Sequence, residues 1–328
     1  MKCLVTGGAG FIGSHLVDLL LKEGHSVIAL DNLSVGNMKN LENALRQSNF
    51  EFHLADVSLK SEIERFFCDV EIVFHLAGLA DIVPSIENPD GYFNANVIGT
   101  YNVAQLSASA NVKKVVYAAS SSCYGIPEQF PTSEGSACNP QYPYALTKYL
   151  GEQVLMHWNL VYDLPVNSLR LFNVYGPRAR TSGTYGAVFG VFLAQKLAGK
   201  PFTRVGDGSQ TRDFTYVSDV TRAFYMAGIT DKVGLIMNVG SGGTYSVNRV
   251  IELLGGPVVT LPKRPGEPDC TFADISTIRK ELSWEPSVDL SEGISKLLEH
   301  IEDWKDAPLW DVESIERATK SWFNSLGR

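Results

Sequence analysis

The sequence Thr6-Gly7-Gly8-Ala9-Gly10-Phe11-Ile12-Gly13 decides the fold. It follows an apolar run at residues 3–5, which predicts a strand, and it leads into a helical pattern at residues 14–22. Glycines spaced in this way let the chain turn tightly, let backbone N–H groups approach a pyrophosphate, and let the helix pack closely on the strand. A helix amino terminus placed there also presents the positive end of its dipole to phosphates. The motif predicts a dinucleotide-binding turn; a chance glycine turn is the alternative.

The pattern continues outward from this turn. Strands are expected at residues 3–5, 26–30, 50–55, 72–76, 114–119 and 166–172, and helices at residues 14–22, 61–67, 94–110 and 141–162. This alternation, with strands rich in β-branched residues, predicts an α/β fold with a Rossmann-type, doubly wound parallel sheet. After about Asn173 glycine and proline become frequent, which indicates a smaller mixed α/β lobe. We expect a dinucleotide-binding domain over residues 1–172 and a substrate-binding lobe over residues 173–328, discontinuous, with segments that return to the sheet.

Composition argues against several classes of protein. The chain has 328 residues, 45% of them hydrophobic, which is enough for one large core and a smaller lobe. No run approaches the roughly 18 apolar residues that span a bilayer, and the amino terminus lacks the pattern of a secretion signal. The five cysteines are odd in number and none are spaced C-x-x-C, so neither a disulfide framework nor a metal site is expected. We expect a cytoplasmic protein without a membrane partner, and the net charge of −8 argues against a nucleic-acid partner.

Asp31 narrows the choice of dinucleotide. It ends the second expected strand, 18 residues after Gly13. A carboxylate there accepts hydrogen bonds from the ribose 2′-hydroxyl and repels a 2′-phosphate, which favours NAD over NADP. We expect the cofactor to contact Gly7, Gly10, Phe11, Ile12, Gly13, Asp31, Asn32, Ser34, Gly36, Asp56, Val57, Leu76, Ala77, Gly78, Asn96, Tyr144 and Lys148. His75 lies inside an apolar strand, so we expect a hydrogen-bonded core histidine there rather than a catalyst.

A tyrosine and a lysine four residues apart, Tyr144 and Lys148, indicate the reaction centre. On a helix these side chains share a face, and an ammonium group beside a phenol, helped by the positive charge of the cofactor, lowers the pKa of the phenol. Tyr144 would then serve as a general base near neutral pH. The spacing alone is equally typical of an ordinary helix surface. The interpretation as a reaction centre is supported by the run Ser120-Ser121-Ser122-Cys123-Tyr124-Gly125. This run ends a strand at the edge of the sheet where such folds bind substrates.

Together these motifs resemble the extended short-chain dehydrogenases/reductases of the nucleotide-sugar epimerase/dehydratase family, and most closely its UDP-glucose and UDP-N-acetylglucosamine 4-epimerases. The resemblance runs through nearly the whole chain. It is carried by residues 6–13, 31–32, 75–78, 120–125, 144–148, 171–177, 206–208, 212–214 and 238–240. It implies a shared first step, oxidation of the sugar at C4. In that step Tyr144 takes the proton of the C4 hydroxyl, Ser120 hydrogen-bonds the same oxygen, and Lys148 holds the nicotinamide ribose.

The two residues after Ser120 bear on the type of reaction. Family dehydratases usually carry an Asp-Glu pair there for elimination across C5 and C6, whereas this chain has Ser121 and Ser122, which cannot supply a carboxylate. That difference favours an NAD-dependent UDP-sugar 4-epimerase, which acts through a transient 4-keto sugar. A 4,6-dehydratase is the first alternative, if Cys123 or a carboxylate from elsewhere takes part; otherwise Cys123 is a small buried residue. A non-catalytic dinucleotide sensor is the second, although it would have no use for an intact catalytic set.

The resemblance also implies where the nucleotide sugar binds. Arg212 and Arg264 would clamp the diphosphate with their forked donors. Asn173 would bond a phosphate, and Glu267 would lie near the nucleotide ribose. Further substrate contacts are expected from Ser121, Ser122, Arg178, Thr271, and from Val188 within residues 185–189. The position of Thr271 resembles a gate, at which a bulky aromatic side chain admits plain hexoses only; Thr271 is small, so N-acetylhexosamines are expected to enter.

The expected assembly also follows from the resemblance. The helices at residues 94–110 and 141–162 resemble the pair that forms a four-helix dimer interface in this family. Val154, Leu155 and Trp158 on the second helix are consistent with a homodimer, and they would equally suit a buried helix. By analogy alone, the synthesis of cell-surface polysaccharide precursors is the expected setting.

Overall fold

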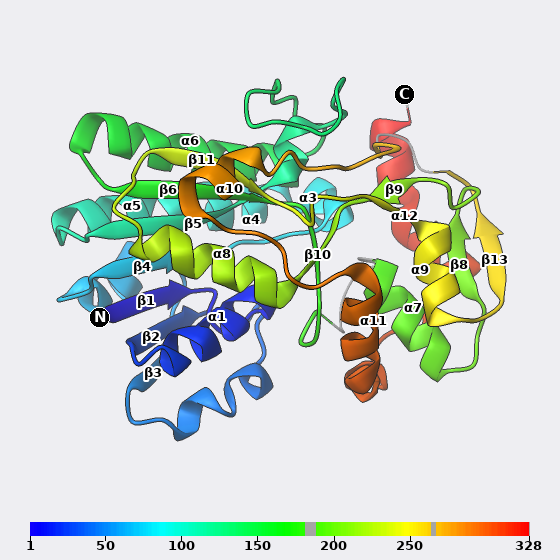
Figure 1. Cartoon of the computed structure of the whole chain (residues 1–328), viewed down its shortest axis with the longest axis horizontal. Coiled ribbons are helices and arrows are strands. Elements are labelled where there is room, and N and C mark those ends of the chain that lie inside the picture. The colour runs from blue at the N-terminus through cyan, green and yellow to red at the C-terminus, as the bar shows by residue number, and fades with distance from the viewer. Residues whose placement is uncertain (181–187, 264–266, 328) are drawn as a thin grey trace.

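Seven parallel strands form the central sheet of the computed structural model, which describes residues 1–180, 188–263 and 267–327. Their spatial order is β11-β6-β5-β4-β1-β2-β3 (Figure 1). The strands are β1 (Lys2–Thr6), β2 (Ser26–Asp31), β3 (Phe50–Leu54), β4 (Ile72–His75), β5 (Lys114–Ser120), β6 (Val166–Leu171) and β11 (Leu235–Val239). The strand order reverses between β1 and β4, and ligands bind such sheets at the carboxyl ends of the strands beside this point. The predicted doubly wound parallel sheet is confirmed.

Each face of the sheet carries its own apolar core, because successive side chains of a strand point to opposite faces. Val5 belongs to the core under α1 and α8, and Leu4 belongs to the core under α5 and α6. The covering helices are α1 (Phe11–Lys22), α8 (Val217–Ile229), α5 (Gly99–Ser109) and α6 (Pro143–Tyr162). Figure 1 shows α1 and α8 next to each other over one face, and the two helices are in contact. The sheet is therefore buried on both sides, as its apolar strands require.

Three helices differ from the predicted pattern. The helix expected at residues 94–110 follows α4 (Pro89–Phe93) and begins with a π-helical turn, Asn94–Ile98, before it continues as α5. The helix expected at residues 61–67 is α2 (Lys60–Ile63) followed by a 3-10 turn at Glu64–Phe67. A further helix, α3 (Ile82–Glu87), lies after β4. It was not predicted, because six residues with an internal proline show no clear helical period.

The second half of the chain forms the smaller mixed lobe around a third apolar core. Its strands pair as β7 (Asn173–Tyr175) with β10 (Phe214–Tyr216), β8 (Phe202–Val205) with β13 (Val258–Leu261), and β9 (Thr211–Arg212) with β12 (Tyr245–Ser246). Its helices include α7 (Val188–Leu197), α9 (Val247–Leu254), α11 (Leu290–Glu299) and α12 (Val312–Leu326), whereas α10 (Ser276–Leu282) packs on β11 of the central sheet. Between these elements α8 and β11 return to the central sheet, where β11 pairs with β6. The division of the chain at residue 172 stays a prediction.

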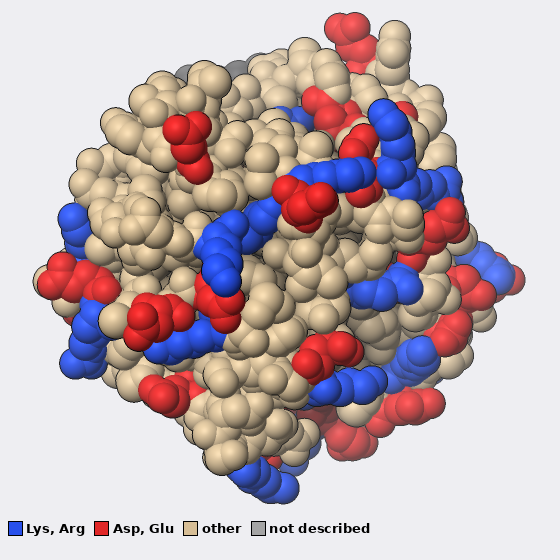
Figure 2. Space-filling model, turned by 60° about the vertical axis from the view of Figure 1, so that its left-hand side comes forward, with Lys and Arg blue, Asp and Glu red and all other residues tan. Residues whose placement is uncertain are grey.

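The surface carries charges of both signs. Figure 2 shows lysines and arginines interspersed with aspartates and glutamates over one face of the molecule. Across residues 1–180, 188–263 and 267–327, no helix combines the length and the apolar character that crossing a bilayer would take. The five cysteines are free thiols.

A buried ion pair fixes α6 to the sheet. The carboxylate of Glu152 accepts hydrogen bonds from Arg170 Nη2 at 2.6 Å, from Arg170 Nε at 3.0 Å and from Ser168 Oγ at 2.9 Å. The two charged side chains are almost fully buried. Arg170 Nη1 also donates to Tyr124 Oη at 3.0 Å, and this hydroxyl donates to Asn238 Oδ1 at 2.7 Å. The network therefore joins α6, β6, β11 and the turn after β5.

The substitution Glu152→Gln is expected to lower the free energy of unfolding by about 3–5 kcal/mol, because Arg170 would stay buried without its countercharge. The matched control is Lys296→Gln, which removes a half-exposed ion pair with Glu292 on α11 and is expected to cost about 0–1 kcal/mol. Urea unfolding followed by circular dichroism measures both. Equal losses in the two variants would contradict the weight given to the buried pair.

Candidate active site

The glycine turn lies at the carboxyl ends of the central strands. Gly7 has φ +71°, which favours glycine, and a Cβ there would lie 2.7 Å from the backbone nitrogen of Ala77, just after β4. A Cβ on Gly13 would lie 2.1 Å from the carbonyl oxygen of Gly7. Gly10 precedes α1, so the first turn of this helix borders the cavity beside the glycines. The predicted strand–turn–helix unit is present, and backbone N–H groups at its helix amino terminus are placed for a phosphate.

Asp31 has a second role that its sequence position did not reveal. Its carboxylate accepts hydrogen bonds from the N–H groups of Ala9 at 3.0 Å and Leu33 at 2.8 Å, and so ties the glycine turn to the end of β2. Burial raises the pKa of this carboxyl, and the backbone hydrogen bonds offset part of that effect. Gly36 lets the chain pass close by, since a Cβ there would lie 2.6 Å from Asp31 Oδ1.

A dinucleotide cavity of about 610 Å³ follows these strand ends. Of the residues predicted to contact the cofactor, its lining contains Gly7, Gly10, Phe11, Ile12, Gly13, Asp31, Asn32, Ser34, Gly36, Asp56, Val57, Leu76, Ala77 and Gly78. The volume is typical of a ligand pocket. Trp304 and Trp310 of the smaller lobe also line it, and no motif predicted them.

Asn96 is absent from the lining of the dinucleotide cavity, and its contact with the cofactor stays a prediction. This buried amide accepts the N–H of Leu79 at 2.8 Å, donates to the Leu79 carbonyl at 3.0 Å, and donates to Thr147 Oγ1 at 2.9 Å. It therefore holds the loop after β4 against α6.

His75 is the core histidine that was predicted. Both of its ring nitrogens lie within hydrogen-bond distance of threonine hydroxyls, and burial lowers its pKa to about 3.

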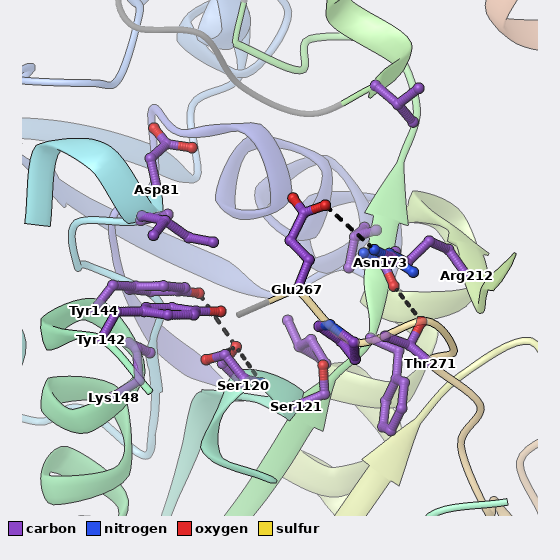
Figure 3. A pocket seen from close by; sticks show the side chains of 18 of the residues that line it. Asp81, Ser120, Ser121, Tyr142, Tyr144, Lys148, Asn173, Arg212, Glu267 and Thr271 are labelled. Atoms are coloured by element: carbon purple, nitrogen blue, oxygen red, sulfur yellow. Dashed lines mark hydrogen bonds and ion pairs between the residues drawn. The ribbon is translucent and has the colours of Figure 1, made fainter. Parts of the chain in front are cut away.

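A substrate cavity of about 590 Å³ adjoins the first, and Phe11 and Gly78 line both. Tyr144 and Ser120 meet inside it, where Tyr144 Oη donates to Ser120 Oγ at 3.3 Å (Figure 3). Ser120 Oγ also lies 2.8 Å from Ser122 Oγ. The end of β5 and the first turn of α6 thus bring two hydroxyl groups together inside this cavity.

Lys148 lies one turn along α6 from Tyr144, with its Nζ 4.4 Å from the centroid of the Tyr117 ring. Burial lowers the pKa of Lys148 to about 7, against the opposing effect of Glu152. Burial also raises the pKa of Tyr144, and the hydrogen bond to Ser120 offsets part of that rise. In the chain without its cofactor, loss of solvent therefore outweighs the neighbouring polar groups. The predicted lowering also depends on the positive charge of the cofactor, and it stays a prediction.

Most of the described residues that were predicted to contact the nucleotide sugar lie around the substrate cavity. Ser121, Ser122, Asn173, Val188, Arg212, Glu267 and Thr271 line this cavity. Arg212 Nη2 lies 3.8 Å from Glu267 Oε2, across the cavity from Tyr144 in Figure 3. Thr271 Oγ1 donates to Asn173 Oδ1 at 2.8 Å and accepts the N–H of Asp213 at 3.0 Å. The hydroxyl of Thr271 is thereby fixed, and its small side chain leaves room beside it.

Arg178 is absent from the lining of both cavities, and its contact with the sugar stays a prediction. The chain turns at this residue with φ +61°, and its Nη2 pairs with Asp18 Oδ2 of α1 at 2.7 Å. Arg264, and residues 185–187 of the segment expected to line the nucleotide base, lie outside the described residues.

Several cavity residues were missed by the sequence analysis. Tyr142 stacks on Tyr144 with ring centroids 6.3 Å apart. Asp81 lines both cavities and pairs with Arg180, Nη1 to Oδ2, at 2.9 Å. Trp322 of α12 lines the substrate cavity. Asp81 had a usable signal, since it follows β4 at the ligand-binding edge, whereas Trp322 reaches the cavity only through tertiary packing.

Known proteins resemble this chain over most of its length. The model of the NAD-dependent epimerase/dehydratase family matches residues 3–240. A UDP-glucose 4-epimerase from Mycolicibacterium smegmatis is 39% identical over 308 residues, which cover 91% of this chain and 98% of that protein. The structure of a UDP-glucose 4-epimerase from Thermotoga maritima with UDP-glucose has a TM-score of 0.86 at 34% identity, over 92% of this chain and 99% of that one. A UDP-glucuronic acid 4-epimerase from Bacillus cereus, in complex with UDP-glucuronic acid and NAD, has a TM-score of 0.87 at 32% identity, with the same shares covered. The chain belongs to the NAD-dependent epimerase/dehydratase family, which confirms the predicted family, its enzymatic class and NAD as the cofactor.

Proposed function

We propose that the protein is a UDP-sugar 4-epimerase that retains NAD and inverts C4 through a transient 4-keto sugar. The observation that carries the proposal is the pair of hydroxyls, Tyr144 Oη and Ser120 Oγ, inside the substrate cavity, which shares part of its lining with the dinucleotide cavity. Ser121 and Ser122 also line the substrate cavity in the place where family dehydratases carry carboxylates. The 4-epimerases among the similar proteins support the same conclusion.

Each catalytic side chain has a role that its position supports. Tyr144 takes the proton of the C4 hydroxyl, and Ser120, already within hydrogen-bond distance of Tyr144, holds the same sugar oxygen. Lys148 would hold the hydroxyls of the nicotinamide ribose. NAD, when bound, supplies the hydride acceptor and a positive charge. Since burial raises the pKa of Tyr144, we infer that the phenol becomes an effective base only when that positive charge is present.

A 4,6-dehydratase is the alternative that the cavity disfavours. Among the described residues, the carboxylates that line the substrate cavity belong to Asp81 and Glu267. Asp81 is paired with Arg180, and Glu267 faces Arg212, so each has a guanidinium as its neighbour. Cys123 is buried in the core and is absent from the lining of both cavities.

NMR analysis of the products tests the proposed reaction. The protein with NAD is incubated separately with UDP-glucose, UDP-N-acetylglucosamine, UDP-glucuronate, dTDP-glucose and GDP-mannose. Inversion at C4 of a UDP-sugar is the expected result. A 4-keto-6-deoxy product would establish the dehydratase instead, and bound NAD with no turnover of any sugar would favour a sensor.

We further infer how the nucleotide is held. Arg212 and Asn173 would bind the diphosphate, with Arg264 as a second guanidinium, and Glu267 would accept the ribose hydroxyls. Val188 lines the same end of the cavity and would contact the base. This arrangement leaves the sugar directed toward Ser120 and Tyr144.

The surface of α5 and α6 supports a homodimer. Tyr101, Leu160, Val161 and Tyr162 are exposed there, and Tyr101 packs edge-on against Trp158 at 5.4 Å. We propose that two copies bury these apolar side chains in a four-helix interface.

We also propose that the protein is cytoplasmic and that it supplies precursors for polysaccharide synthesis. Its five free thiols suit a reducing compartment.

Light scattering after size exclusion tests the interface. The wild type is expected at twice the mass of the chain, and Val161→Lys at the mass of one chain, because it would bury an unpaired charge between the copies. Lys113→Gln, an exposed substitution away from these helices, is the control and is expected to stay dimeric. A monomeric wild type would contradict the homodimer.

Tyr144→Phe is expected to lower kcat by about 10²–10⁴-fold while leaving the Kd for NAD within a few-fold, because it removes the proton acceptor and keeps the ring. Tyr142→Phe is the matched comparison, since it removes a hydroxyl from the stacked neighbour without touching Ser120, and its loss of kcat should be at least tenfold smaller. Steady-state kinetics give kcat, and titration of the protein with NAD gives the Kd. Retained turnover in Tyr144→Phe would show that another group is the base.

Thr271→Tyr is expected to lower kcat/KM for UDP-N-acetylglucosamine at least tenfold more than for UDP-glucose, because a bulky side chain would fill the space for an N-acetyl group. Thr271→Ser keeps the hydroxyl that bonds Asn173, and its ratio of the two kcat/KM values should match the wild type. An equal loss for both sugars in Thr271→Tyr would refute the gate.

A further inference from the structure

Asp81 is a carboxylate that the proposed reaction does not use, although it lines both the dinucleotide and the substrate cavity. It directly precedes α3 and has φ +82°, in a region that L residues rarely adopt. Strained backbone of this kind is concentrated at functional sites, because the surrounding structure must hold it in place. The residue is therefore a candidate for a role at the point where the nicotinamide and the sugar would meet.

The position of Asp81 is fixed from two sides. Arg180, from the segment after β7 in the smaller lobe, donates through Nη1 to Asp81 Oδ2 at 2.9 Å. Tyr92 donates its hydroxyl to the carbonyl of the preceding residue, Ala80, and its ring packs edge-on against Tyr144 at 6.4 Å. The ion pair thus joins the two lobes directly beside the proposed catalytic base.

The charges around Tyr144 are arranged asymmetrically. In Figure 3 Asp81 and Lys148 lie on opposite sides of the Tyr144 ring. Asp81 is close enough for its negative charge to raise the pKa of Tyr144. Of the described charged residues that line the substrate cavity, Arg212 and Glu267 belong to its other end, so Asp81 provides the negative charge at the sugar end.

We expect the C6 group of the bound sugar at the end of the substrate cavity that holds Asp81. With the C4 hydroxyl against Tyr144 and Ser120, C6 is two bonds from C4 and would lie in the same part of the cavity. A hydroxymethyl group there can donate a hydrogen bond to a carboxylate. A C6 carboxylate would instead meet a like charge in a partly desolvated site, where repulsion is poorly screened.

Resting on the proposed function, we propose that Asp81 is a specificity-determining residue that selects UDP-hexoses with a neutral C6 group and rejects UDP-hexuronates. It acts in two ways. Its carboxylate repels the acidic sugar, and its ion pair occupies Arg180, the nearby guanidinium that would otherwise pair with the sugar's carboxylate.

Asp81→Asn tests the proposal with little disturbance of the backbone, because asparagine is similar in shape and is among the residues that best tolerate positive φ. The measured quantity is the ratio of kcat/KM for UDP-glucuronate to that for UDP-glucose, with NAD-loaded protein. The wild type is expected to favour UDP-glucose at least tenfold, and Asp81→Asn should raise the ratio at least tenfold. Asp81→Asn combined with Arg180→Gln should give back part of that gain, since the freed guanidinium is then removed.

Asp18→Asn is the matched control. It breaks another aspartate–arginine pair, to Arg178 in the same segment as Arg180, yet both of its members are absent from the lining of the two cavities. The ratio of kcat/KM for UDP-glucuronate to that for UDP-glucose in Asp18→Asn should equal the wild-type ratio. If the ratio rises as much in Asp18→Asn as in Asp81→Asn, the cause is a loosening of the segment that holds Arg178 and Arg180, and the proposal is overturned. A ratio unchanged within twofold in Asp81→Asn, or a wild type that prefers UDP-glucuronate, would also overturn it.

A failure of the proposed epimerase function can be distinguished from a failure of the proposal for Asp81. If the wild type inverts none of the UDP-sugars, UDP-N-acetylglucosamine included, the epimerase proposal fails, and the selection is measured instead as the ratio of the Kd values for UDP-glucuronate and UDP-glucose. The same tenfold shift between wild type and Asp81→Asn is then expected. If Asp81→Asn does not fold, Asp81→Gly, which accepts the same backbone conformation, takes its place in the same comparison.

Discussion

The close approach of Gly13 to the carbonyl of Gly7 is the constraint on which the rest of the site depends. Only glycine fits where a Cβ would come within 2.1 Å of that oxygen, and the contact sets the angle at which α1 leaves β1. Asp31 then locks the turn through the N–H of Ala9. Because of this packing, Phe11 reaches a position where it borders both cavities. A shift of the turn would therefore disturb the cofactor site and the sugar site together.

Burial governs the chemistry that these residues can perform. The phenol of Tyr144 and the ammonium of Lys148 are both removed from solvent, which raises the pKa of the first and lowers that of the second. Each group is thus pushed toward its neutral form. The positive charge of a bound nicotinamide would favour the ionised form of the phenol, whereas it would disfavour the charged ammonium group still further.

The fold and the glycine turn could be predicted because their signals are local. The glycine turn, Asp31 and the apolar strands each act through residues close in sequence, and the structure contains them as expected. Contacts between residues far apart in the sequence could not be predicted. Asn96 is occupied by Leu79 and Thr147, and Arg178 is paired with Asp18, and neither partnership has a signature in the sequence.

The electrostatics of the site were only partly predictable for the same reason. The spacing of Tyr144 and Lys148 correctly placed both on one side of α6, but it carried no information on how deeply the sheet and the smaller lobe would enclose them. The ion pair between Asp81 and Arg180 joins segments that are 99 residues apart. Such pairs form only after the two lobes have packed.

The return of α8 and β11 to the central sheet has a consequence for how the chain is made. Until residues 217–239 have left the ribosome, β6 remains an open edge strand and the apolar face shared by α1 and α8 lacks one of its two helices. The amino-terminal half by itself would therefore expose an unpaired strand edge and an apolar surface, both of which favour association with other chains. The central sheet can be completed only after the second half has been synthesised.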